Sequence, residues 1–115
     1  MPGYRLAFNK TAFDGNGTVA NAVWTGRPED RLPVRIATLT PDQLHIMDGF
    51  ERAPAHYLRT LVDVPLNGDR TLPCHIYLGH PDRLGEGRPS EAYLQHIVTG
   101  YAEAGLEPPD PSAGY

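Results

Sequence analysis

The chain has 115 residues, the size of a single domain, and 40% of them are hydrophobic, which is ordinary for a globular protein. Its formal net charge of −4, with scattered basic residues, argues against a nucleic-acid or anionic-membrane partner. A single cysteine excludes an internal disulfide framework, and no apolar run is long enough to span a membrane. The start of the chain has no hydrophobic signal-peptide core. We therefore expect a soluble, cytoplasmic domain.

Strands dominate the first third of the chain, where they are predicted at residues 4–9, 18–24 and 32–39. In the first of these strands, Tyr4, Leu6 and Phe8 alternate with other residues and should share one face. In the third, Pro33 fits only at the start of the strand or on a sheet edge, because proline has no N–H to donate.

A helix is predicted over residues 41–50. Thr40 is a suitable N-cap, Pro41 suits the first helical position, and Gln43 completes a capping box. Apolar side chains then recur at helical spacing and form one stripe. Pro54 prevents the helix from continuing.

A hairpin and a second helix follow. The arms of the hairpin are predicted at residues 57–64 and 71–78, and the turn between them is signalled by Asn67-Gly68. The side chains expected to point inward from these arms are Leu58, Val62, Val64, Leu72, Cys74, Ile76 and Leu78. The second helix begins near Ser90, an N-cap residue, and Gly105 stops it.

The order of these elements is strand, strand, strand, helix, hairpin, helix, which differs from the strict alternation of a doubly wound sheet. It favours an α+β fold, a small mixed β-barrel with two flanking helices. We expect one domain over residues 1–106. The Pro-rich tail, residues 107–115, is expected to be disordered.

Glu51 is the candidate catalytic residue. It follows the first helix, where the helix dipole is negative, and Met47 and Phe50 before it are apolar. If the site is partly desolvated, both effects raise the pKa of the carboxyl group and make it a better proton acceptor near neutral pH. A solvated glutamate at a helix end would fit the same spacing.

Short segments in a fixed order carry a family resemblance. They are GYRLAF at 3–8, VANAV at 19–23, LTPDQLHIMDGFE at 39–51, YLR at 57–59, IY at 76–77, PSEAY at 89–93 and GYAEAGL at 100–106. In sequence and order they resemble the gamma-glutamylcyclotransferase-like (AIG2-like) family, whose catalytic segment is similar to residues 39–51.

The resemblance implies a function and a set of site residues. The reaction is the cyclising cleavage of a γ-glutamyl amine or peptide to 5-oxoproline and free amine, with Glu51 as general acid/base. Tyr57 and Tyr93 would orient this small-molecule substrate or line its pocket, with helix packing as the alternative for Tyr93. Arg59 would face the substrate carboxylate, or form a surface salt bridge. No cofactor is implied, and no histidine or cysteine pair has metal-ligand spacing.

The sequence departs from the family pattern at its start. It contains no Y-G-S-N-L substrate loop, so we expect the family's N-terminal strand to be absent and one sheet edge to be open. A second copy of the chain, or a partner chain, could pair with this edge. The alternative function is a non-catalytic binding or assembly module that keeps the fold.

Overall fold

The structure is a computed structural model that describes residues 1–108. Its elements in chain order are β1 (Tyr4–Thr11), β2 (Thr18–Trp24), α1 (Pro41–Phe50), β3 (Tyr57–Pro65), β4 (Thr71–Gly79), the short 3-10 helix η1 (Pro81–Arg83) and α2 (Glu91–Glu103). Most of the predicted tail, residues 109–115, lies outside the described residues, and 107 and 108 have no regular secondary structure.

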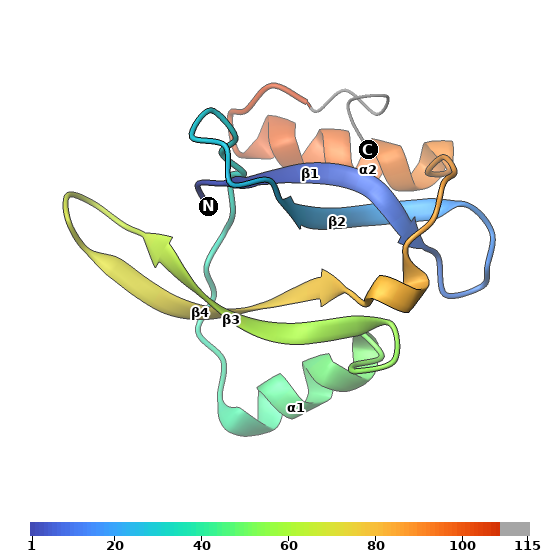
Figure 1. Cartoon of the computed structure of the whole chain (residues 1–115), viewed down its shortest axis with the longest axis horizontal. Helices are drawn as coiled ribbons and strands as arrows, with labels where there is room; N and C mark the ends of the chain where they lie inside the picture. The colour runs from blue at the N-terminus through green and yellow to red at the C-terminus, as the bar shows by residue number, and fades with distance from the viewer. Residues whose placement is uncertain (109–115) are drawn as a thin grey trace.

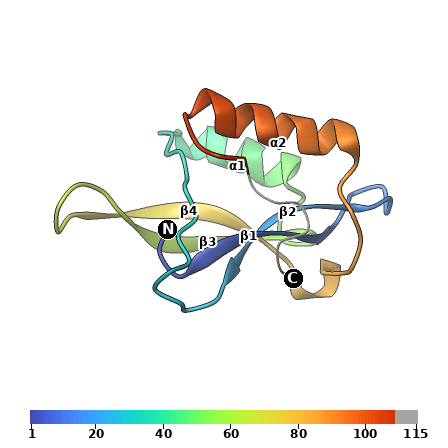
Figure 2. The same ribbon diagram turned by 90° about the horizontal axis from the view of Figure 1, so that it is seen from above.

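The strands form two separate antiparallel sheets, β1–β2 and β3–β4. They meet where β2 approaches β4 (Figure 1). Both helices lie on the same side of the strands, α2 along the first sheet and α1 along the second (Figures 1 and 2). The predicted α+β class is confirmed, but the predicted mixed barrel is not. Within residues 1–108 no sheet closes on itself and no parallel pair forms.

The predicted strand over residues 32–39 is wrong. Leu32 donates its N–H to the carbonyl oxygen of Met1 at 3.0 Å, and Arg31 forms one isolated bridge with Pro2. Residues 33–39 then run without regular structure and, within the described chain, make no backbone–backbone hydrogen bond. A β-strand requires a partner for its ladder, and no neighbouring strand supplies one here.

The hairpin is confirmed, with β3 and β4 paired from Tyr57 opposite Gly79 to Pro65 opposite Thr71. The connecting loop is longer than a two-residue turn, because Leu66 donates its N–H to the carbonyl oxygen of Arg70 at 2.8 Å. Of the side chains expected to point inward, Val64 is buried, whereas Leu58 and Leu72 are exposed. The inner face of this small sheet is therefore only partly covered.

A bulge in β1 explains why Tyr4, Leu6 and Phe8, which were predicted to share one face of the strand, differ in burial. The pairing with β2 shifts between Ala7 and Lys10. An extra residue in one strand interrupts the two-residue period, so side chains on the two sides of the bulge need not share a face. Ala7, Phe8 and Lys10 are buried, whereas Tyr4 and Leu6 are only partly so.

The helix ends behave as the sequence predicts. Thr40 caps α1, and its hydroxyl oxygen accepts from the N–H of Gln43 while the Gln43 side chain accepts from the Thr40 N–H, which completes the capping box. Ser90 caps α2 in the same way, accepting from Tyr93. Neither helix has the length and apolar character that a membrane crossing would need.

The loop between β1 and β2 depends on two glycines in the left-handed region, Gly15 (φ +78°) and Gly17 (φ +75°). A Cβ at Gly17 would lie 2.7 Å from the carbonyl oxygen of Arg88, whereas one at Gly15 would meet nothing within 4 Å. We expect Gly17→Ala to lower the free energy of unfolding by about 2 kcal/mol or more and Gly15→Ala by about 1 kcal/mol, because only the first adds a clash to the backbone strain. Urea unfolding of both variants measures the difference, and equal losses would contradict the proposed backbone contact.

Candidate active site

Glu51 is held at the C-terminal end of α1 by the local backbone. It is the C-cap residue, and its N–H donates to the carbonyl oxygen of Met47 at 2.9 Å. The turn that follows is closed by two further bonds, from the Ala53 N–H to the Asp48 oxygen at 2.9 Å and from the His56 N–H to the Arg52 oxygen at 2.8 Å. The chain then enters β3, so this turn, residues 51–56, which we call the Glu51 turn, is fixed between a helix and a strand.

The Glu51 carboxyl group is partly buried, and its burial raises its pKa above the ordinary glutamate value. The ammonium group of Lys10 acts in the opposite direction and lowers this pKa. The carboxylate also raises the pKa of the phenols of Tyr57, Tyr77 and Tyr93, which burial raises first. Lys10 and these three tyrosines are thus titratable groups that interact electrostatically with Glu51.

Tyr57 and Tyr93 meet at one residue of β2, Ala20. The Tyr93 hydroxyl oxygen accepts from the N–H of Ala20 at 3.0 Å, and the Tyr57 hydroxyl donates to the Ala20 carbonyl oxygen at 3.4 Å. Two predicted site residues from β3 and α2 are thus brought together on a third element. Both hydroxyls are occupied, which fixes the two rings in place.

Asn21, the next residue, joins the two sheets. Its side-chain oxygen accepts from the Gly79 N–H of β4 at 2.8 Å, and its amide nitrogen donates to the Asn9 side chain at 3.2 Å. Asn21 is only 7% exposed. The sequence reasoning did not assign this residue a role, although a polar side chain within an apolar strand is a signal that could have found it.

Residues 1–95 match the family model described as gamma-glutamyl cyclotransferase, AIG2-like. The chain belongs to this family. No match was found among curated proteins or among solved structures. The resemblance read from the sequence is confirmed at the level of the family, and Glu51, Tyr57, Arg59 and Tyr93 all fall inside the matched range.

In this cyclotransferase-family domain Arg59 has an internal partner. Its Nε lies 3.4 Å from the Oδ1 of Asp48, to which the Tyr77 hydroxyl also donates at 2.5 Å. Burial, followed by this hydrogen bond to Asp48, raises the pKa of Tyr77 to about 12. The salt bridge named as one alternative for Arg59 is therefore present, and contact of Arg59 with a substrate carboxylate stays a prediction.

Lys10 is a second residue that the sequence reasoning missed. Its Nζ lies 3.1 Å from the Nδ1 of His56, at the end of the Glu51 turn. The only signal in the sequence is that Lys10 is the single lysine of the chain and directly follows the strand predicted at residues 4–9.

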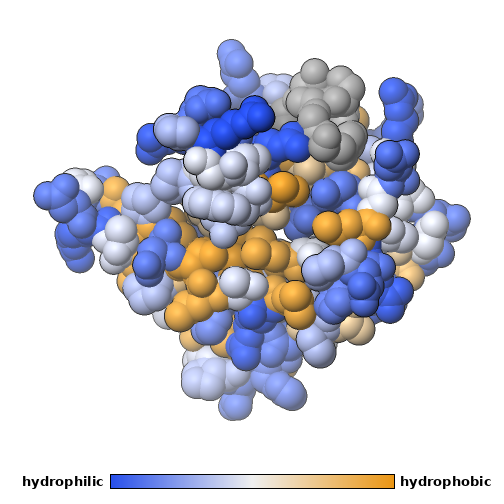
Figure 3. Space-filling view, viewed as in Figure 1, coloured by the Kyte–Doolittle hydropathy of each residue, from blue (hydrophilic) through white to orange (hydrophobic). Residues whose placement is uncertain are grey.

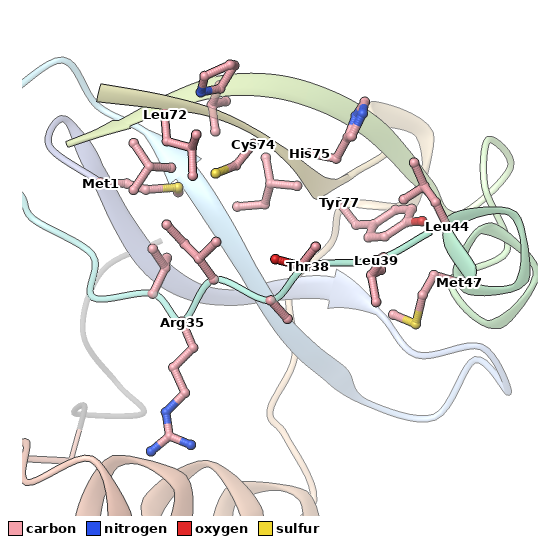
Figure 4. Close-up of a pocket in the computed structure, with 17 residues that line it drawn as sticks. Met1, Arg35, Thr38, Leu39, Leu44, Met47, Leu72, Cys74, His75 and Tyr77 are labelled. Carbon is pink, nitrogen blue, oxygen red and sulfur yellow. The ribbon is translucent and has the colours of Figure 1, made fainter. Parts of the chain in front are cut away.

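An apolar groove of about 500 Å³ lies beside the candidate active site, between residues 34–39 and the β3–β4 hairpin (Figure 3). Tyr77, Leu44 and Met47 stand at one end of it, and Arg35 points away from it (Figure 4). Glu51 does not line it. No cluster of three histidine, cysteine or acidic side chains that could hold a metal ion is found in residues 1–108.

Proposed function

We propose that this protein cleaves γ-glutamyl amines or peptides by intramolecular cyclisation, with Glu51 as general acid/base. The observation that carries the proposal is the partly buried Glu51 carboxyl group at the end of α1, whose pKa is raised by burial. Membership of the AIG2-like cyclotransferase family supports the same reaction class. We further propose a cytoplasmic location, since a single cysteine suits a reducing compartment.

The main chemical task of the protein in this reaction is proton transfer. The α-amine of the γ-glutamyl group attacks its own side-chain carbonyl carbon, a five-membered lactam forms, and the amide bond to the amine breaks. Because nucleophile and electrophile belong to one molecule, ring closure has a high effective molarity. Glu51 takes a proton from the α-ammonium group and later gives one to the departing amine. A pKa closer to neutrality suits a group that performs both steps.

The neighbouring residues receive supporting roles in this proposal. Tyr57 and Tyr93 line the site beside the carboxylate, and their bonds to Ala20 keep their rings from moving during the reaction. The Nε of Arg59 forms the ion pair with Asp48. We propose that the two terminal nitrogens of the guanidinium group bind the substrate carboxylate. No metal ion or cofactor is required.

A second candidate function, an assembly module without turnover, is favoured by one observation. Val34, Ile36 and Leu39 are exposed, and their segment makes no backbone–backbone hydrogen bond within residues 1–108. The backbone N–H and C=O groups of such a segment can form hydrogen bonds with a strand of a second copy of the chain. Sedimentation velocity over a range of concentrations tests this, and a monomer at all concentrations would count against it.

The assay that tests the favoured function measures 5-oxoproline and free amine released from a panel of γ-glutamyl amino acids, dipeptides and amines. Release of the two products in equal amounts supports the proposed chemistry, because one cyclisation yields one of each. Absence of both products from a folded protein, across the whole panel, overturns it in favour of the assembly module.

A further inference from the structure

Lys10 is the only lysine among the 115 residues, and the other nine basic side chains that carry a permanent charge are arginines. It lies in β1, at the end of the bulge, and its relative exposure is 0%. Lysine is seldom fully buried unless its ammonium group has partners. The surroundings of this one therefore call for a physical explanation.

The ammonium group sits in a compact cage. It donates to the carbonyl oxygen of Thr11 at 2.5 Å and contacts the Nδ1 of His56 at 3.1 Å. It also lies 4.7 Å from the ring centres of both Phe13 and Tyr57. Because an ammonium nitrogen only donates, the Nδ1 of His56 must accept, so this histidine is neutral. The pKa of His56 is accordingly lowered, by burial and then by Lys10 and two nearby arginines.

The same cage holds the Glu51 turn from both ends. His56 closes the turn and receives the Lys10 hydrogen bond. Arg52, immediately after Glu51, lies over the Phe13 ring at 4.3 Å, the ring that also faces Lys10. Two cations and one aromatic ring thus bind the turn to β1 and to the start of the loop after it.

We propose that Lys10 is a positioning residue for the cyclisation: it pins the turn that carries Glu51 and holds a positive charge close to that turn. The inference rests on the proposed function. Lys10 does not touch the substrate, since its side chain is fully buried. A lysine suits the cage because its compact ammonium group reaches the Thr11 carbonyl oxygen and the Nδ1 of His56 at once.

The charged and titratable groups around this pair give the direction of the effect. The groups that interact with Glu51 are Lys10, Tyr57, Tyr77 and Tyr93. The groups that interact with Lys10 are Arg83, Glu51, Arg52, His56 and Tyr57. Burial, Arg83 and Arg52 lower the pKa of Lys10, and Glu51 is the carboxylate that raises it. Since Lys10 in turn lowers the pKa of Glu51, removal of its charge must raise that pKa further.

The kinetic test compares Lys10→Met with the wild type across pH. The acid limb of kcat/KM should move to higher pH, so that activity at pH 6 falls about threefold or more relative to activity at pH 8.5. Lys10→Arg, which keeps the charge, should return the limb towards its original position. Arg70→Met, an exposed arginine in the hairpin loop, removes the same charge elsewhere and should leave the profile unchanged. A folded Lys10→Met protein with an unshifted acid limb overturns the proposal.

A second measurement needs neither a folded Lys10 variant nor turnover. Selective isotope labelling of lysine gives a single side-chain signal in NMR, because the chain has one lysine. The pKa of Lys10 should be lower in Glu51→Gln than in the wild type, since the coupling between two titrating groups is reciprocal. An identical pKa in both proteins overturns the proposal. If the assay finds no product while this coupling is present, the proposed function fails and the electrostatic pairing stands.

Discussion

Glu51→Gln should abolish the release of 5-oxoproline, with kcat/KM falling by about 10³-fold or more, while the protein stays folded. Glutamine has nearly the same shape and keeps the backbone of the C-cap position, but its amide accepts no proton from the substrate ammonium group. The measurement is kcat/KM on the best γ-glutamyl substrate, alongside urea unfolding of the same preparation. Glu103→Gln, at the exposed end of α2, is the matched control and should change kcat/KM by less than about twofold.

The pH dependence of activity and stability in the wild type, compared with Glu51→Gln, follows from the raised pKa of Glu51. In the wild type the acid limb of kcat/KM should lie above the ordinary range of an exposed glutamate, because burial favours the protonated form. Since the folded state binds this proton more tightly than the unfolded chain, the wild type should gain stability relative to Glu51→Gln as the pH falls through the folded pKa towards the unfolded value. Full activity of the Glu51→Gln variant would contradict the proposed mechanism.

Asn21→Ala should lower the free energy of unfolding by about 2 to 3 kcal/mol. The substitution leaves the Gly79 N–H without its acceptor, removes the bond to Asn9, and opens a space where β2 meets β4. The expected readout is a lower midpoint of urea unfolding with an unchanged slope. Because Asn21 joins the sheet that carries Ala20 to the sheet that carries Tyr57, we also expect a loss of turnover.

Asn9→Ala separates the two bonds of Asn21. It removes only the contact with the Asn21 amide nitrogen at 3.2 Å and leaves the bond to Gly79 in place. Its cost should be about 1 kcal/mol. Equal losses in Asn9→Ala and Asn21→Ala would mean that the link from β2 to β4 carries little energy, and the view of Asn21 as the joint between the sheets would be wrong.

Local signals in the sequence were sufficient for the elements that depend on local chemistry. The Thr40 cap with its box, the Ser90 cap and the hairpin arms were predicted because their stabilising contacts lie within a few residues. Family membership was also readable, because short segments keep their order over most of the chain. Glu51 could be selected only with the help of that resemblance, since an exposed glutamate at a helix end has the same spacing.

What the sequence did not reveal depends on contacts between distant residues. The strand expected at 32–39 has the right composition, but within residues 1–108 no strand pairs with residues 33–39 through backbone hydrogen bonds. The bulge that turns Lys10 inward is a property of the pairing between β1 and β2 rather than of either strand alone. The meeting of Tyr57 and Tyr93 at Ala20 joins residues that are 37 and 73 positions away from it.

The burial of Lys10 also bears on how the protein is modified and degraded. Enzymes that acetylate lysine or attach ubiquitin to it need a free ε-amine, and within these 115 residues the only one is enclosed by Phe13, Tyr57 and His56. While the domain is folded, such enzymes find no lysine acceptor on it. Local unfolding of β1 is therefore the step that would expose the Lys10 amine to such enzymes.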